Sequence, residues 1–140
     1  MRGEREGSVA HILGLSRIAQ RPHPAGMRDH KSLLAWQEAN AVVRTVMFAT
    51  RGIRHPCVDQ LQHAALSVQL NIAEGYALRS ANRFRNHLDI AYGSAVETAE
   101  FLDLTSELGL FPADRIGPTI ERCRRSQGLL LGLIKRLRRS

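Results

Sequence analysis

The sequence predicts an all-α protein, an antiparallel four-helix bundle with up-down-up-down topology over residues 27–140. Four stretches carry apolar residues three and four positions apart, which is the spacing of one helical face. The links between these stretches are short and hold glycine or proline, residues that end helices. No stretch shows the strict alternation of a half-buried strand. Amphipathic helices joined by short links pack as antiparallel neighbours, so a bundle follows.

The first helix is expected to run from Asp29 or Ser32 to Thr50 and to end before Gly52 and the His55-Pro56 pair. Its core seam is predicted from apolar and small polar residues at alternating intervals of three and four. This seam is Leu33, Trp36, Asn40, Val43, Met47 and Thr50, widened by Ala39, Val42 and Val46.

The second helix, expected from Val58 to Ala77, has two apolar faces. The first is Leu61, Ala65, Val68, Ile72 and Tyr76, and the second is Leu66, Leu70, Ala73 and Ala77. One small bundle buries only one such face. The second face is therefore predicted to contact another copy of the chain, which makes the protein a homo-oligomer.

The third helix is expected to begin at residues 80–82, whose side-chain oxygens suit an N-cap, and to close at Gly109. Its seam is Phe84, Leu88, Ala91, Ala95, Thr98 and Leu102. The fourth helix follows Phe111-Pro112, and Gly117-Pro118 is expected to delay or kink its first turn.

Composition restricts the class of protein. The 140 residues, 44% of them hydrophobic, suffice for one domain with its own core. No apolar run is long enough to cross a bilayer, and we find no secretory signal. Cys57 and Cys123 form no Cys-x-x-Cys pair, which is typical of free thiols in a cytoplasmic protein. Residues 1–26 mix glycine, proline and arginine and are expected to form a flexible tail.

A polar stripe marks residues 67–80, the stretch that the other helices are expected to surround. Ser67, Asn71 and Glu74 repeat four and three apart, so they share one helical face. Buried polar groups need hydrogen-bond partners. Gly93-Ser94 on the third helix is predicted to leave room for a close approach and to give Asn71 or Glu74 a backbone or hydroxyl partner. We favour a structural stripe that fixes the helix register; a binding or catalytic cleft is the alternative.

The same stretch resembles a known family. The resemblance rests on Asn71-Ile72-Ala73-Glu74-Gly75, Ser80, Phe84, Ile90-Ala91, Gly93-Ser94 and Glu97, with Ala35-Trp36-Gln37 upstream. This pattern is similar to that of the four-helix-bundle proteins encoded in intervening sequences of bacterial large-subunit ribosomal RNA genes. The resemblance runs from about Met27 to the C-terminus, and it implies a bundle that assembles into a ring of five subunits.

Other details follow from the resemblance. Met27-Arg28-Asp29 is similar to the start of family members, so we hypothesise that Met27 is the native start and that residues 1–26 are not native. Gln62-His63 stands where the family often has an arginine pair, and Arg83 where it usually has an acidic residue. The resemblance extends to accessory bundle proteins of diversity-generating retroelements, which partner a reverse transcriptase.

The formal net charge of +7 is unevenly distributed. Residues 115–140 carry eight basic side chains against Glu121 alone. The predicted topology brings Arg28 and Lys31 to the same end of the bundle as seven further basic residues. These are the candidate nucleic-acid-binding residues Arg79, Arg83, Arg85, Lys135, Arg136, Arg138 and Arg139. This end is predicted to bind the phosphate backbone of RNA or DNA, and a merely solvated charged surface is the alternative.

The remaining arginines of the fourth helix are expected to be neutralised. Arg122, Arg124 and Arg125 lie early in this helix, and acidic residues of the late third helix are predicted to pair with them. Those acidic residues are Glu97, Glu100, Asp103 and Glu107.

No catalytic motif accompanies these features. The sequence has no Glu-x-x-His repeat, glycine-rich phosphate loop or nucleophile elbow. His55, Cys57, Asp59 and His63 cluster, but with a spacing that fits no zinc pattern. We predict a non-enzyme without cofactor, metal or membrane partner. The functional hypotheses are a nucleic-acid backbone binder, a protein-interaction scaffold or accessory subunit (for example of a reverse transcriptase), and third, an enzyme that uses the polar stripe.

Overall fold

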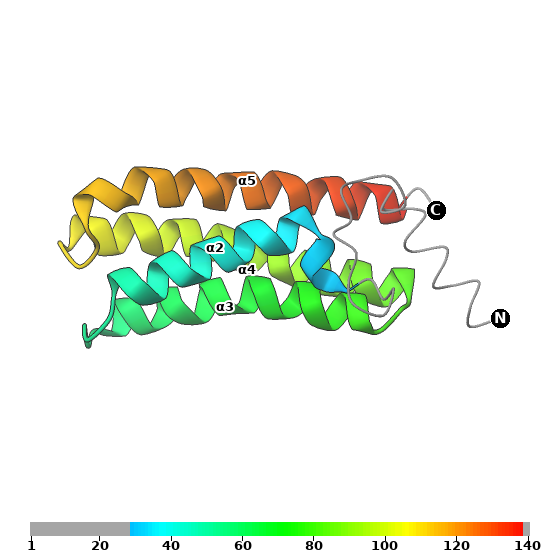
Figure 1. Cartoon of the computed structure of the whole chain (residues 1–140), viewed down its shortest axis with the longest axis horizontal. Helices are drawn as coiled ribbons and strands as arrows, with labels where there is room; N and C mark the ends of the chain where they lie inside the picture. Colours follow the sequence, from blue (N-terminus) through cyan, green and yellow to red (C-terminus); the bar gives the residue numbers. More distant parts are fainter. Residues whose placement is uncertain (1–28, 139–140) are drawn as a thin grey trace.

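The structure is a computed structural model that describes residues 29–138. Its long helices lie side by side (Figure 1). The elements are η1 (His30–Ser32), α2 (Leu34–Ala49), α3 (Pro56–Ala77), α4 (Ala81–Glu107) and α5 (Ala113–Arg138), with no strand among them. Packing of α2 on α3, α3 on α4, α4 on α5 and α5 on α2 closes a ring of helices. The predicted up-down-up-down bundle is confirmed. The predicted tail and the proposed start at Met27 lie outside the described residues.

Side-chain caps start η1, α3 and α4. Asp29 Oδ1 accepts a hydrogen bond from the backbone N–H of Lys31 at 2.9 Å, and Ser80 Oγ accepts one from Arg83 at 3.4 Å. The predicted N-cap of the third helix is therefore confirmed at Ser80. The second helix begins at Pro56 rather than Val58, because His55 Nδ1 accepts from the N–H of Cys57 at 3.0 Å and proline suits the first helical position.

Left-handed residues end three of the helices. Gly109 has a φ of 73°, and Leu110 N–H donates to the carbonyl of Thr105 at 2.8 Å, which closes α4 as predicted. Gly52 follows α2 with a φ of 77°. The turn after α3 differs, because Arg79 occupies the left-handed region with a φ of 55°. This conformation is costly for a side chain with a Cβ.

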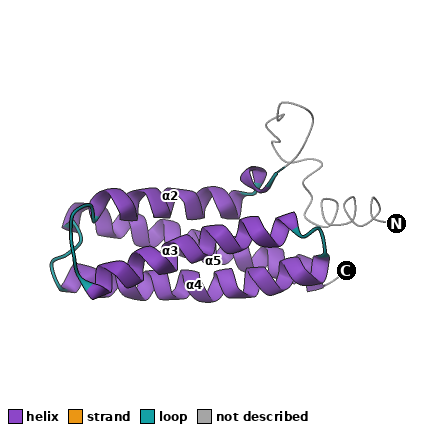
Figure 2. Cartoon of the chain, turned by 90° about the horizontal axis from the view of Figure 1, so that it is seen from below, coloured by secondary structure: helices purple, strands orange, loops and turns teal. Residues whose placement is uncertain are grey.

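The core consists of two clusters, one toward each end of the bundle. The first is centred on Ile72, Phe84 and Leu88, and the second on Leu61 and Leu102. All five side chains are fully or almost fully buried. Figure 2, seen from below relative to Figure 1, shows the long helices enclosing this interior. No described helix has an apolar stretch that could span a membrane.

The predicted seam of the first helix is partly wrong. Trp36, Asn40 and Met47 are only partly buried, whereas the small residues of α2 form the buried row. This row is Ala35, Ala39, Val42, Val43 and Val46, and it continues to the buried C-cap residue Thr50. Small side chains face the interior, while Asn40 stays at the edge, where its Oδ1 accepts a hydrogen bond from Gln69 of α3 at 3.0 Å.

The predicted delay of the fourth helix is also wrong. The helix α5 begins at Ala113 and continues through Pro118, which lies near its start. Pro118 is exposed, so its ring stays in solvent rather than in the core.

Candidate functional site

One end of the bundle collects basic side chains from four elements. Figure 1 shows η1, the turn from α3 to α4 and the end of α5 at the same end of the molecule. We call the basic end the set formed by Lys31, Arg79, Arg83, Arg85, Lys135, Arg136 and Arg138. Arg28 and Arg139, also predicted to lie here, are outside the described residues.

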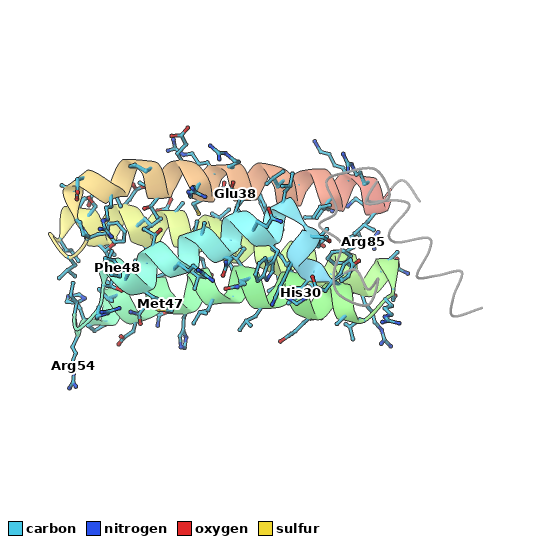
Figure 3. All side chains as sticks on the ribbon, in the orientation of Figure 1. His30, Glu38, Met47, Phe48, Arg54 and Arg85 are labelled. Carbon is cyan, nitrogen blue, oxygen red and sulfur yellow. The ribbon has the colours of Figure 1, made fainter. Side chains whose placement is uncertain are left out.

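The side chains of the basic end are mostly open to solvent. All are exposed except Arg85, which is half-buried and is labelled in Figure 3. The acidic residues on the same helix segments are Asp29, Glu74 and Asp89. Within residues 29–138, no carboxylate forms an ion pair with Arg83, Lys135 or Arg138. The end therefore keeps an excess of positive charge.

The partial charges of the helix ends stabilise some of these basic side chains and not others. Lys135, Arg136 and Arg138 occupy the last turn of α5, where cations interact favourably with the partial negative charge of the helix end. Arg83 lies in the first turn of α4, where the partial charge is positive and no acidic residue compensates it. The arginine and lysine residues of α5 thus have a structural benefit, whereas Arg83 has none from its own helix.

The polar stripe forms a hydrogen-bonded network between α3 and α4. Ser67 Oγ lies 2.7 Å from Ser94 Oγ, so Ser94 is a partner of Ser67 and not, as was predicted, of Asn71 or Glu74. Asn71 Nδ2 donates to the Ser67 carbonyl at 2.8 Å and to Ser67 Oγ at 3.2 Å. Asn71 Oδ1 lies 3.0 Å from Nδ1 of His87. Since the amide oxygen can only accept, His87 carries the proton of this bond on Nδ1.

Two members of the stripe differ from expectation. His87 is a partner that was not predicted. Glu74 projects outward, with 66% of its side chain exposed and its Oε2 4.0 Å from His87 Nδ1. The close approach lies at Gly75 rather than at Gly93. A Cβ on Gly75 would lie 2.6 Å from the Cβ of His87, whereas a Cβ on Gly93 would meet nothing within 4 Å.

The chemistry of this network favours a structural role. Both serine hydroxyls are engaged with each other, and Asn71 separates them from His87. No serine–histidine hydrogen bond occurs among the described side chains, so the network lacks a nucleophile next to a base. It instead fixes the register of α3 against α4 by satisfying half-buried polar groups.

The arginines early in α5 are paired differently from the prediction. Arg122 and Arg125 each lie 3.3 Å from a carboxylate oxygen of Glu38, which belongs to α2 rather than to α4. The physical reason is the position of these arginines on α5, on the side that packs against α2. Arg124 is exposed and takes no part in this pair of contacts.

The histidine and cysteine cluster near the start of α3 serves the backbone. His55 caps α3, because its Nδ1 accepts a hydrogen bond from the backbone N–H of Cys57. Across residues 29–138 no group of three or more histidine, cysteine, aspartate or glutamate side chains could hold a metal ion. The expectation that the protein needs no metal stays a prediction.

Comparisons with known proteins agree with this fold. The family model described as 23S rRNA-intervening sequence protein matches residues 31–132. A crystal structure of a protein of unknown function from the S23 ribosomal protein family of Bacteroides thetaiotaomicron is similar, with 18% sequence identity and a TM-score of 0.62. This similarity covers 94% of this chain and 98% of that chain, and at such identity it shows the fold alone. No curated protein matches the chain.

Proposed function

The chain belongs to the family of 23S rRNA-intervening sequence proteins, and on this premise we propose that it is a non-enzymatic cytoplasmic bundle that binds the phosphate backbone of RNA or DNA through its basic end. The observation that carries the proposal is the gathering of basic side chains from four elements at one end, against few carboxylates. Arginine and lysine bind phosphates without reading base sequence. The expected binding is therefore strong at low salt and indifferent to sequence.

Arg79 gives this proposal a second support. The other two left-handed turn residues are glycines, yet Arg79 holds a φ of 55° with an exposed side chain at the basic end. Strained backbone of this kind is concentrated at functional sites. A charged side chain at this turn is consistent with phosphate binding.

We also propose that copies of the chain assemble through the outer side of α3 and α4. Leu70 on α3 and Ile90 on α4 are 52% and 54% exposed. The bonds from Ser67 to Ser94 and from Asn71 to His87 set the register that places these two side chains at similar height. Assembly would cover them and would combine several basic ends, which raises the avidity for a long polyanion. The family resemblance favours five subunits.

Salt dependence tests the binding proposal. Affinity for a duplex RNA and a duplex DNA of unrelated sequence is measured between about 50 and 200 mM salt, where several phosphate contacts cost about 10³-fold or more. Arg83→Ala and Arg138→Ala should each weaken binding and reduce the salt slope by about one. Arg124→Ala, exposed on α5 but outside the basic end, is the control and should change neither.

Two results would argue against this function. Affinity that does not change with salt would exclude phosphate contacts. Salt-resistant binding to the protein product of a neighbouring gene, with no affinity for either duplex, would support the scaffold hypothesis. Assembly is tested separately: native mass spectrometry should show an oligomer that Leu70→Glu converts to monomer, and a monomeric wild-type chain at micromolar concentration would exclude it.

A further inference from the structure

An exposed aromatic ring lies at the end of the bundle opposite the basic end. Phe48, in the last turn of α2, is 57% exposed. The guanidinium carbons of Arg51 and Arg115 lie 5.3 and 5.0 Å from its ring centroid. Figure 3 labels Phe48 near this end, with Arg54 extending beyond the helices. The periodicity of α2 gave no sign of this site, because Arg115 comes from the start of α5.

The surroundings of Phe48 are basic. Arg44 lies one turn before Phe48 and is exposed, and Arg54 follows in the loop. In the part of the chain that the structure describes, Arg44, Arg51, Arg54 and Arg115 make no ion pair. The acidic residues of the adjoining helix ends are Asp59, Glu107 and Asp114. We call Phe48, Arg51 and Arg115 the aromatic platform.

The platform combines two kinds of contact that single-stranded nucleic acids use. A nucleobase stacks on an aromatic face whatever its sequence, and arginine guanidinium groups bind the adjoining phosphates. Both guanidinium groups lie over the ring in cation–π contacts, so a base that stacks on Phe48 displaces a guanidinium group from the ring face. The displaced group then becomes available to the adjoining phosphate. Core packing does not account for the ring, because Phe48 belongs to neither buried cluster.

We propose that the aromatic platform stacks one unpaired base of a single-stranded RNA or DNA on Phe48 while Arg51 and Arg115 bind its phosphates. This inference rests on the proposed nucleic-acid binding but concerns the other end of the bundle. The helix α4 has 27 residues and spans about 40 Å. Because the platform and the basic end lie at opposite ends of the bundle, they are separate sites. The basic end binds any phosphate backbone, whereas the platform requires an accessible base.

The test compares Phe48→Ala with wild type on three probes: an oligouridine, the same strand with abasic sites, and a duplex. Phe48→Ala should weaken oligouridine binding by about 5-fold to 100-fold, as expected for one lost stack. The loss should be absent on the abasic strand and on the duplex. Phe48→Trp should retain or raise the affinity. Val96→Ala, an exposed apolar change on α4, is the matched control and should have no effect.

Several outcomes would overturn the platform. They are an unchanged oligouridine affinity in Phe48→Ala, an equal loss on all three probes, or a Phe48→Leu variant as good as wild type. A changed oligomeric mass of Phe48→Ala would assign the ring to a contact between copies instead. If wild type binds the duplex as proposed but Phe48→Ala alters nothing, only the platform fails. If wild type binds none of the probes, the proposed function fails with it.

Discussion

Gly75 of α3 lies so close to His87 of α4 that a Cβ on the glycine would come within 2.6 Å of the Cβ of the histidine. Phe84 is also near, with a ring carbon 3.1 Å from that position. Neither atom is the free end of a flexible side chain. The Cβ of His87 is fixed by the α4 backbone, and the Phe84 ring is buried in the core. The glycine thus sets how closely the two helices pack.

Gly75→Ala should therefore destabilise the protein. Alanine is a better helix former than glycine by up to about 1 kcal/mol. Overpacking against His87 costs about 1–3 kcal/mol, so we expect a net loss of up to about 2 kcal/mol in the free energy of unfolding. Urea denaturation measures it. Gly93→Ala is the matched control on α4, where the new Cβ meets nothing, and should raise stability. An equal effect of both substitutions would contradict the close packing.

Asn71→Leu should lower stability without affecting nucleic-acid binding. The substitution removes the bonds to Ser67 and His87. The Ser67 hydroxyl keeps its bond to Ser94, but Nδ1 of the half-buried His87 loses its hydrogen-bond partner. One such loss costs about 1–3 kcal/mol. Glu74→Gln, on the same face but 66% exposed, should change stability little. A fully stable Asn71→Leu protein that no longer binds duplex RNA would instead make the stripe a binding site.

Helix periodicity predicted the fold well because each helix is long and amphipathic. It could not assign the buried row of α2, where two rows of suitable residues lie side by side. Tertiary contacts with α3 determine which row of α2 is buried. Gln69 donates a hydrogen bond to Asn40, and Gln62 donates one to Thr50 at 3.0 Å. Such contacts depend on the placement of α3, which a single sequence does not fix.

The candidate sites differ in how much the sequence could reveal. The basic end follows from topology alone, because helix ends meet in an antiparallel bundle. Ser94 was predicted to be a partner of the stripe, but for Asn71 or Glu74. Its bond to Ser67 and the pairing of His87 with Asn71 both need the exact helix register. Phe48 and Arg115 lie far apart in sequence, so their contact required the structure.

Cys123 should resist alkylation while Cys57 reacts. Burial raises the pKa of the Cys123 thiol from its ordinary value of 9.0 to about 11, and its Sγ lies 3.2 Å from the carbonyl of Ala95. Cys57 is only partly buried. Iodoacetamide at pH 8, followed by peptide mass spectrometry, should label Cys57 first. Rapid labelling of both thiols in the folded protein would contradict this burial.

The same thiol predicts a stability loss in alkali. Because the pKa of Cys123 is raised on folding, the folded state keeps the proton longer than the unfolded chain. The contribution is fully present below pH 9.0 and is lost as the pH rises to about 11. Other groups titrate in this range, so the comparison is with Cys123→Ala, whose stability should fall less between these two values. Parallel curves would contradict the prediction.

Ser126→Ala should maintain or raise stability. Ser126 Oγ is buried and has no hydrogen-bond partner among the described residues. It lines a small cavity of about 10 Å³ together with Thr98 and Cys123. Removing an unsatisfied hydroxyl recovers about 1 kcal/mol. Thr119→Val on the same helix is the control, because Thr119 Oγ1 donates to the Arg115 carbonyl at 2.7 Å, and its loss should destabilise. A destabilised Ser126→Ala would indicate a hydroxyl satisfied by buried water.

Arg79→Gly should separate stability from binding. A residue other than glycine loses about 1–2 kcal/mol in the left-handed region, and Arg79→Gly removes this cost at a φ of 55°. Glycine also raises the conformational entropy of the unfolded chain, which offsets part of the gain. The net gain in the free energy of unfolding should be up to about 1 kcal/mol. The same change removes one cation from the basic end, so duplex affinity should fall and the salt slope should drop by about one.

Arg83→Ala provides the comparison for Arg79→Gly, because Arg83 lies in the first turn of α4, just after the turn that holds Arg79. It removes a charge from the basic end at a residue with helical backbone, so it should weaken duplex binding. Its stability should rise only by the roughly 0.3 kcal/mol that removing an exposed cation from a helix N-terminus gives. Because exposed surface substitutions seldom change stability by more than about 0.5 kcal/mol, a larger gain in Arg79→Gly alone identifies backbone strain. If Arg79→Gly becomes more stable yet binds duplex as well as wild type, the strain at this turn serves something other than phosphate binding.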